Sequence, residues 1–191
     1  MSITNSIGLK LAGIGAVVGG LCWIAAVAWY AQQPLGSDDL KEGWDTFNRY
    51  VTLIPILFIG AIIGMHGETD GNRGKLALWI VLLGTGVIAG LRLLVDVGGL
   101  PSPFVILGVL VYSVAFLWFL AVTIRSGCFP RAPTIALAVG TVLMLAFIGT
   151  DSAFIWFATP YAFAWMWVGY TLIAGNDRTR STADVAAGNY R

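Results

Sequence analysis

The sequence predicts an all-α polytopic membrane protein, a compact bundle of six transmembrane helices with both termini in the cytoplasm. Composition is the first reason, because 58% of the 191 residues are apolar and 11% are charged, against about a quarter charged in a typical soluble domain. Length is the second. Several apolar stretches can cross a hydrocarbon core about 30 Å thick at about 1.5 Å per residue. Because backbone groups in lipid have to be satisfied within the segment, such stretches favour helices over barrel strands.

Six apolar stretches are bounded by charged residues or by Gly and Pro. They cover residues 8–30, 49–66, 76–96, 103–124, 132–150 and 153–174. The first is longer than the apolar core of a secretory signal, so we interpret it as a retained helix. Short connections between the stretches predict a single transmembrane domain over residues 1–175. Residues 176–191 are polar and are expected to form a loose cytoplasmic tail.

Basic residues predict the orientation of the bundle, because cytoplasmic loops carry an excess of Lys and Arg. The side that holds the termini carries Lys10, Arg73, Lys75, Arg125, Arg131, Arg178, Arg180 and Arg191. The other side carries Lys41 and Arg49, and Arg92 to the extent that its side chain reaches it. We therefore expect a multi-pass protein of the cell membrane with both termini inside.

The first outer loop, residues 31–48, is the longest connection and the most acidic. Ser37 is placed to cap a helix, and Leu40, Trp44 and Phe47 follow at helical spacing to form one apolar face. This pattern predicts a short helix that lies at the outer interface and continues into the second stretch. The alternative is an acidic solvated loop with a tryptophan anchor.

Two prolines interrupt apolar stretches, Pro55 in the second and Pro160 in the sixth. Each removes a backbone donor and loosens the helix one turn earlier, near Val51 and Trp156, which releases carbonyls for a partner. The alternative is a kink that improves packing only. The sixth stretch is also rich in aromatic residues, which either line a pocket for a lipid, quinone or pigment tail or serve as core and lipid-facing residues.

Glycines at four-residue spacing occur once in each of the first three stretches. The pairs are Gly15 and Gly19, Gly60 and Gly64, and Gly86 and Gly90. Such pairs allow two helices to approach closely. With 24 glycines in the chain, however, about as many pairs are expected by chance, so the pairs alone do not identify an interface.

Arg92 and Asp96 lie within or beside the third apolar stretch, four residues apart and therefore on one helix face. In one interpretation they form an interfacial pair, with the Arg92 side chain extending about one turn to water. In the other they belong to an outward-facing polar vestibule. Its candidate residues are Arg92, Asp96, Asp151, Arg49, Tyr50, Pro55 and Pro160. It would bind a cation through the aspartates or a small anion through the arginines.

Polar residues near the middle of the membrane are few. The candidates are Thr85, Tyr112, Ser113 and Thr141. No carboxylate is placed for a proton relay across the bilayer. A transporter site is normally near this depth and uses broken helices in both halves of the chain, so the scarcity of polar groups here is an argument against a transporter.

The sequence contains no catalytic motif. The single histidine, His66, excludes a zinc site or a haem held by two histidines, and no triad, P-loop or dinucleotide-binding glycine motif occurs. No cofactor and no metal are therefore expected. The net charge of +1 gives no reason to expect nucleic-acid binding, and Cys22 and Cys128 are not placed to form a disulfide.

These observations favour a non-catalytic subunit or accessory protein of a larger membrane complex. Its partners would be the lipid bilayer and other membrane subunits, or a second copy of the chain. The alternative is a small transporter or channel that uses the outer vestibule around Arg92, Asp96 and Asp151. A lipid-modifying or redox enzyme is a third hypothesis, and it would require a cofactor or metal that the sequence does not indicate.

Overall fold

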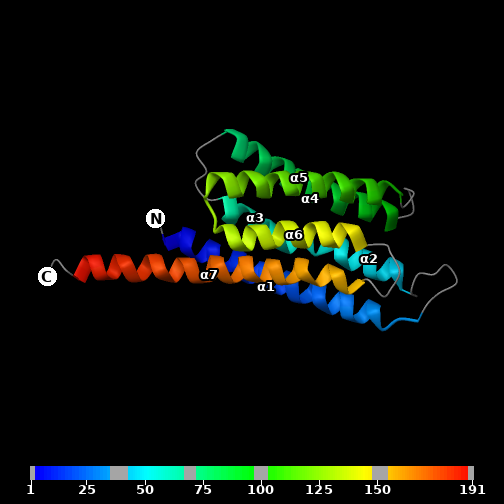
Figure 1. Cartoon of the computed structure of the whole chain (residues 1–191), viewed down its shortest axis with the longest axis horizontal. Helices are drawn as coiled ribbons and strands as arrows, with labels where there is room; N and C mark the ends of the chain where they lie inside the picture. The colour runs from blue at the N-terminus through cyan, green and yellow to red at the C-terminus, as the bar shows by residue number, and fades with distance from the viewer. Residues whose placement is uncertain (1–2, 35–42, 67–71, 97–102, 148–154, 189–191) are drawn as a thin grey trace.

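The structure is a computed structural model that describes residues 3–34, 43–66, 72–96, 103–147 and 155–188. Within these ranges every regular element is a helix (Figure 1). The α-helices are α1 (Ile3–Ala31), α2 (Trp44–Leu53), α3 (Pro55–His66), α4 (Asn72–Asp96), α5 (Pro103–Ser126), α6 (Arg131–Phe147) and α7 (Thr159–Gly188). A short 3₁₀-helix, η1 (Ile155–Ala158), precedes α7. The prediction of an all-α fold is confirmed for the described residues.

Four stretches of the described chain are long and apolar enough to cross a membrane: Ile7–Ala31, Trp44–His66, Gly74–Val95 and Leu107–Ser126. Arg131–Ala146 in α6 is apolar but shorter. Large apolar side chains also face outward, including Leu83, Val111 and Val114, each more than 60% exposed. Exposed apolar surface on this scale fits lipid rather than water as the solvent. The chain is thus a membrane protein, and the count of six crossings stays a prediction.

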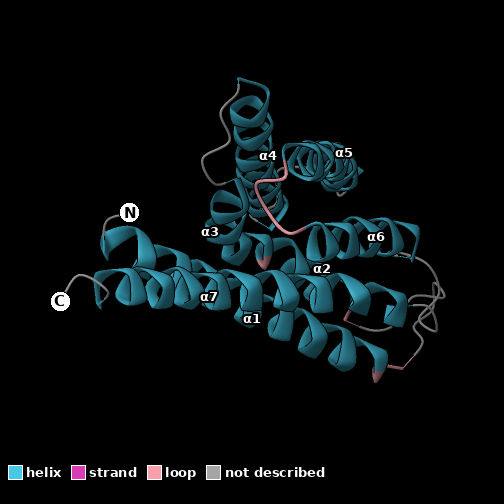
Figure 2. Cartoon of the chain, turned by 60° about the vertical axis from the view of Figure 1, so that its left-hand side comes forward, coloured by secondary structure: helices cyan, strands magenta, loops and turns pink. Residues whose placement is uncertain are grey.

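The helices form a closed ring in which each packs on two neighbours, in the order α1, α7, α6, α5, α4 and α3. Figures 1 and 2 show α1 beside α7 and α4 beside α5. Helix α2 precedes α3 in the chain and lies at one end of the ring. Both termini lie at the opposite end (Figure 1), which we call the terminal end; the end that carries α2 is the distal end.

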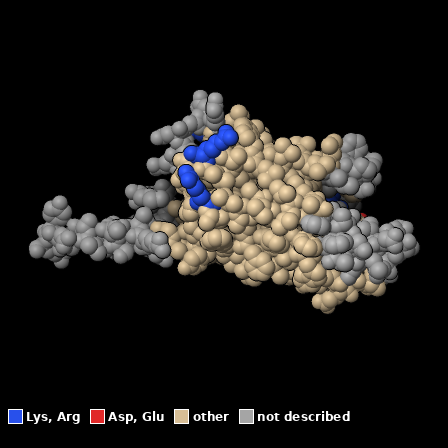
Figure 3. All heavy atoms as spheres, in the orientation of Figure 1, with Lys and Arg blue, Asp and Glu red and all other residues tan. Residues whose placement is uncertain are grey.

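Charged side chains follow this division of the bundle. Figure 3 shows Lys and Arg side chains gathered at the terminal end of the visible face. Lys10, Lys75, Arg125 and Arg131 all belong to helix segments at that end. The grouping of basic residues on which the predicted orientation depends is therefore present in three dimensions, whereas the side of the membrane that this end faces stays a prediction.

Glycine allows α1 and α3 to touch. A Cβ at Gly19 would collide with the ring of Phe58, and one at Gly60 would lie 3.3 Å from Ala12. A Cβ at Gly64 of α3 would lie 3.2 Å from Leu9, which belongs to α1 as Ala12 does. The first two predicted glycine pairs therefore meet across one helix pair, in the close approach that small residues permit.

The third glycine pair behaves differently. A Cβ at Gly86 or at Gly90 of α4 would have no described atom within 4 Å. These glycines bring no described helix close to α4, which instead packs on α5 through Gly84, where a Cβ would lie 3.2 Å from the ring of Tyr112. The four-residue spacing alone does not distinguish glycines that contact another helix from glycines that do not.

The closest helix pair, α1 with α7, uses glycines seven residues apart. A Cβ at Gly13 would lie 2.7 Å from the carbonyl oxygen of Gly169, and one at Gly20 would lie 2.8 Å from that of Ala162. As the α1 numbers rise the α7 numbers fall, so the two helices are antiparallel. A seven-residue spacing keeps both glycines on one helix face, which a search for four-residue pairs overlooks.

The helix predicted at the outer interface is part of the second membrane stretch. It begins at Trp44 after Gly43, which has φ 81°, and it runs through Ile54 into α3. Trp44 and Phe47 pack on Tyr30 of α1, with ring centroids 5.6 and 4.6 Å away. The predicted cap Ser37 and Leu40 lie outside the described residues.

The last helix differs from the prediction at both ends. It begins at Thr159, so Pro160 occupies its first turn, where a missing N–H costs no helix hydrogen bond. Pro160 therefore does not kink a longer helix. At the other end α7 continues to Gly188, although the tail was expected to be loose; no proline or glycine interrupts residues 176–187, so nothing local ends the helix.

Candidate functional site

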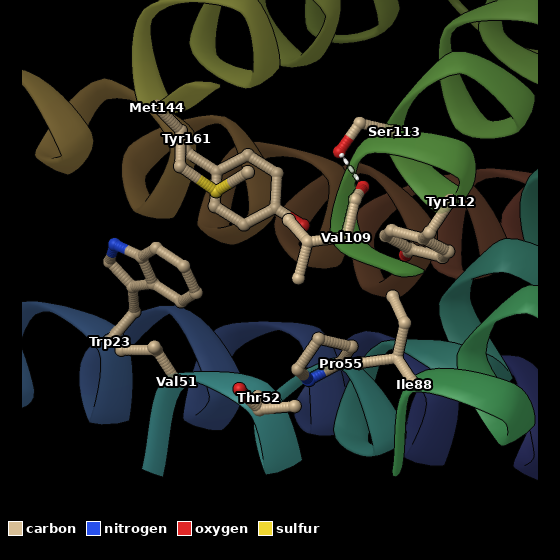
Figure 4. A pocket seen from close by; sticks show the side chains of 10 residues that line it. All are labelled: Trp23, Val51, Thr52, Pro55, Ile88, Val109, Tyr112, Ser113, Met144 and Tyr161. Carbon is tan, nitrogen blue, oxygen red and sulfur yellow. Dashed lines mark hydrogen bonds between the residues drawn. The ribbon is translucent and has the colours of Figure 1, made fainter. Parts of the chain in front are cut away.

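All seven α-helices meet at one internal cavity of about 40 Å³ (Figure 4). We call it the central cavity. It is lined by Trp23 of α1, Val51 and Thr52 of α2, Pro55 of α3, Ile88 of α4, Val109, Tyr112 and Ser113 of α5, Met144 of α6 and Tyr161 of α7. A position shared by every helix of the bundle is where a bound molecule or a conformational change would affect the whole fold.

Four of the lining residues carry hydroxyl groups: Thr52, Tyr112, Ser113 and Tyr161. The Ser113 hydroxyl donates to the carbonyl of Val109 at 2.7 Å, the bond drawn in Figure 4. Its oxygen keeps acceptor capacity for a second partner. The cavity wall is therefore apolar with a few polar groups, and none of its side chains carries a charge at neutral pH.

The Tyr112 hydroxyl is buried in the α5 wall of the central cavity. It lies beside the hydroxyl of Thr85, within hydrogen-bonding range, and the Thr85 hydroxyl itself donates to the Val81 carbonyl at 3.0 Å. Among the described residues, no group completes a hydrogen bond of good geometry to the Tyr112 oxygen. A buried hydroxyl without a full partner is uncommon in native structures and often marks a place where water or a ligand binds.

Aromatic contacts hold the opposite wall of the cavity in place. Trp23 meets Tyr161 edge to face with ring centroids 5.0 Å apart, and its indole N–H donates to the carbonyl of Ala158 at 3.2 Å. Below them, Phe58 of α3 stacks on Trp165 of α7 with centroids 4.1 Å apart and planes 6° apart. These contacts tie α1, α3 and α7 together directly beside the cavity.

Glycine positions the start of α7 against α6. A Cβ at Gly140 would lie 2.7 Å from the Cα and 2.8 Å from the backbone nitrogen of Tyr161. Only a residue without a side chain allows this approach. Gly140 thereby sets how far Tyr161 reaches toward α5, and Figure 4 shows the hydroxyl end of Tyr161 directed that way.

The break at Pro55 lies at the midpoint of the Trp44–His66 stretch, because this membrane stretch begins at Trp44 and not at residue 49, where the predicted stretch began. Pro55 has no N–H to give to the Val51 carbonyl. The chain continues around the break through two bonds, from Ile54 N–H to Tyr50 at 3.1 Å and from Leu57 N–H to Ile54 at 2.9 Å. The predicted loosening at Pro55 is thus present as a junction between α2 and α3, and Pro55 and Val51 both line the central cavity.

Arg92 lies near the distal end of α4, but its side chain does not extend to the surface. It is 4% exposed, and its Nη2 donates to the backbone carbonyl of Asp45, in the first turn of α2, at 3.3 Å. The interpretation in which Arg92 extends to water is therefore wrong. The reason is that α2 packs on α4 and offers the Asp45 carbonyl as a partner.

The other vestibule candidates are dispersed. Arg49 and Tyr50 are exposed on α2, and Pro160 is in the first turn of α7, where the Thr159 hydroxyl donates to the Trp156 carbonyl at 2.7 Å. Asp151 and the side chain of Asp96 lie outside the described residues. Among the seven candidates, Pro55 lines the central cavity and Tyr50 lines a separate groove.

That groove, which we call the α1–α2 groove, has a volume of about 610 Å³ and is open on the surface of the bundle. It is lined by Cys22, Ala25, Ala26, Trp29, Thr46, Tyr50, Leu53, Ile54 and Leu57. On α1 the lining residues Cys22, Ala25 and Ala26 are small, and the aromatic side chains of Trp29 and Tyr50 flank them. The sequence analysis missed this groove, since none of its α1 residues is a glycine.

The side chains that line the cavity and the groove include no His, Asp or Glu. In the described part of the chain no three His, Cys, Asp or Glu residues come together to hold a metal ion. The central cavity can form hydrogen bonds and the α1–α2 groove can bind apolar surface. No protein-family model, curated protein or solved structure matches this chain, so its function has to be argued from these two features.

Proposed function

We propose that the protein is a non-catalytic subunit or accessory protein of a membrane complex, and that it binds a transmembrane helix of a partner in the α1–α2 groove. The observation that carries the proposal is the groove itself, about 610 Å³ of surface hollow beside three small residues of α1. Association of helices in lipid depends on close van der Waals packing, which small residues allow.

The rest of the bundle supports a binding role over chemistry. The aromatic core beside the cavity is close-packed, as in the stack of Phe58 on Trp165, and the described residues hold no metal-binding cluster. Tyr50 is 58% exposed and Trp29 is 40% exposed, so both are available to contact a partner. Large aromatic side chains at the edge of an apolar surface are typical of interface anchors.

The chain offers a direct test, because one of its two cysteines, Cys22, is exposed within the groove. In a Cys128→Ser variant, a photoactivatable maleimide attached to Cys22 in native membranes should give one discrete adduct with a second protein. The matched control moves the thiol to Val114 of α5, which is 69% exposed on another face, in a Cys22→Ser, Cys128→Ser background. Identical adducts from both positions would contradict the proposal.

A second variant tests whether the partner binds in the groove or only lies near Cys22. Ala26→Leu fills the groove, and it should dissociate the complex in a native gel in mild detergent while the isolated protein keeps its thermal stability. Val114→Leu is the control and should leave the complex intact. A protein that migrates alone before either substitution, with no co-purifying chain, would rule out the accessory role.

The alternative function is a small transporter or channel. One observation favours it: the central cavity lies at the Pro55 junction, where the helix is broken between α2 and α3. Transporter sites are often built at such helix breaks. In this proposal the vestibule formed by Arg92, Asp96 and Asp151 leads toward the cavity, and Asp96→Asn or Arg92→Gln should abolish uptake into vesicles without unfolding the protein.

A further inference from the structure

We propose that the central cavity binds a water-sized neutral molecule that both donates and accepts hydrogen bonds, and that α2 is the cover through which this molecule exchanges with the distal end. The proposal does not depend on the accessory role. It is supported by the size and polarity of the cavity and by the way α2 is attached to its neighbours.

The size of the cavity limits what it can hold. Its volume of about 40 Å³ compares with about 10–15 Å³ of such volume needed for one water molecule. One to about three waters, or one molecule of similar size, therefore fit. An ion is unsuitable, because no lining side chain supplies a compensating charge and an uncompensated charge in such a site is very costly.

The polar groups of the wall define the chemistry of the guest. Tyr112 has a buried hydroxyl with no complete hydrogen bond among the described residues, and Ser113, one residue on, has an oxygen able to accept. Tyr112 of α5 and Tyr161 of α7 both line the cavity, and Figure 4 shows the hydroxyl end of Tyr161 directed toward α5. A guest that accepts from Tyr112 and donates to Ser113 would satisfy groups that the protein alone leaves incomplete.

Helix α2 closes the cavity toward the distal end. Val51 and Thr52, in its last turn, form part of the lining. At that end of α2, Pro55 interrupts the hydrogen bonding into α3. At the other end, the rings of Trp44 and Phe47 pack on Tyr30 of α1. The bond from Arg92 to the Asp45 carbonyl adds a polar attachment to α4 in the same turn.

Movement of α2 about Pro55 would lift Val51 and Thr52 away from Tyr112 and Tyr161. Because Val51 and Thr52 are the only α2 residues in the described lining, this one motion opens the cavity on the distal side while the other six helices stay in place. Breaking the Arg92 bond should favour the open position, and restoring an N–H at Pro55 should oppose it.

X-ray hydroxyl-radical footprinting in detergent or nanodiscs tests occupancy, because radicals formed from a bound water oxidise the side chains beside it. We expect oxidation of Tyr112, Met144 and Tyr161 despite their burial. Met65 and Tyr30 are the matched controls, since they are the same residue types, are as deeply buried and are not among the residues that line the cavity; they should stay unmodified. Equal protection of both groups would overturn the binding site.

Mixing with H₂¹⁸O before timed X-ray pulses tests the cover, because the label reports how fast the bound water exchanges. Arg92→Met keeps much of the side-chain bulk and removes the donor, so exchange at Tyr112 and Tyr161 should become about tenfold faster, the effect of losing one charge-assisted bond. Pro55→Ala should slow it, and Arg125→Met at the terminal end should leave it unchanged. Exchange rates unaffected by both Arg92→Met and Pro55→Ala would overturn the role of α2, even with the cavity occupied.

Discussion

The guanidinium of Arg92 in α4 donates to the backbone carbonyl of Asp45 in α2, with 3.3 Å between Nη2 and the carbonyl oxygen. A side-chain cation thus holds the first turn of a helix 47 positions away in sequence. The contact is 4% exposed on the arginine side, so it is protected from competition by water, and it joins the second and third membrane-crossing stretches at the distal end.

Replacement of Arg92 should destabilise the bundle. We expect Arg92→Met to lower the free energy of unfolding by about 1.5–3 kcal/mol, the contribution of a hydrogen bond to a charged group. Arg92→Lys should recover part of this, because lysine keeps the charge but lacks the planar fork. SDS titration in mixed micelles measures the effect, with exposed Arg125→Met as a control within about 0.5 kcal/mol of the wild type. Equal stabilities for Arg92→Met and Arg125→Met would contradict the role of the contact.

Glycine substitutions should separate contact positions from open ones. Gly140→Ala places a Cβ 2.7 Å from the Tyr161 backbone, and we expect a loss of about 1–3 kcal/mol from overpacking. Gly86→Ala meets nothing within 4 Å and should stabilise its helix by about 0.5–1 kcal/mol, the usual gain of alanine over glycine. The same titration measures both. A larger loss at Gly86 than at Gly140 would show that the packing of α6 on α7 is misassigned.

The stack of Phe58 on Trp165 should be a main source of stability. Phe58 is fully buried, so we expect Phe58→Ala to cost about 3–5 kcal/mol, as for other buried aromatic residues. Phe163 is the same residue type at 58% exposure, facing outward from α7, and Phe163→Ala should cost about 0.5 kcal/mol or less. Thermal unfolding of the two variants in one detergent checks the difference, and similar losses would mean that Phe58 is not a core residue.

Thiol labelling tests the predicted orientation. Cys128 lies in the turn between α5 and α6 at the terminal end, where its thiol donates to the Met65 carbonyl at 3.4 Å. In a Cys22→Ser variant, a membrane-impermeant maleimide should label Cys128 only after right-side-out vesicles are permeabilised. Cysteine introduced at Gln32, exposed just beyond α1 at the distal end, in a Cys22→Ser, Cys128→Ser background should react in sealed vesicles. The reverse pattern would place both termini outside.

The sequence predicts four of the stretches that are long and apolar enough to cross a membrane in the described chain, because length and apolar composition are local properties. It predicts poorly which side of each helix faces inward. When lipid is the solvent, both faces of a helix are apolar, so Trp23 and Met144 of the cavity wall could not be distinguished from lipid-facing residues such as Trp167 and Val139. Tyr112 and Ser113 could be, since a hydroxyl group at mid-depth is unusual there, but nothing in the sequence indicated that they line a cavity.

Arg92 shows why the remaining part of the site was not predictable. Arg92 lies about one turn from the end of α4, as the sequence indicated. In an isolated helix a side chain at this position would extend to water. The deciding fact is the position of α2 over α4, which depends on the start of α2 at Trp44 and on the break at Pro55. Contacts of this kind follow from tertiary packing and leave no pattern within either segment.

The antiparallel pairing of α1 with α7 has a consequence for biogenesis. The ribosome releases α1 before α7, so the surface around Gly13 and Gly20 lacks its native neighbour until α7 has been synthesised. Until then lipid or an insertion factor has to cover that strip. A nascent chain arrested before Tyr161 should therefore remain a substrate for membrane quality control, and the last helix completes the fold by closing the ring onto the first.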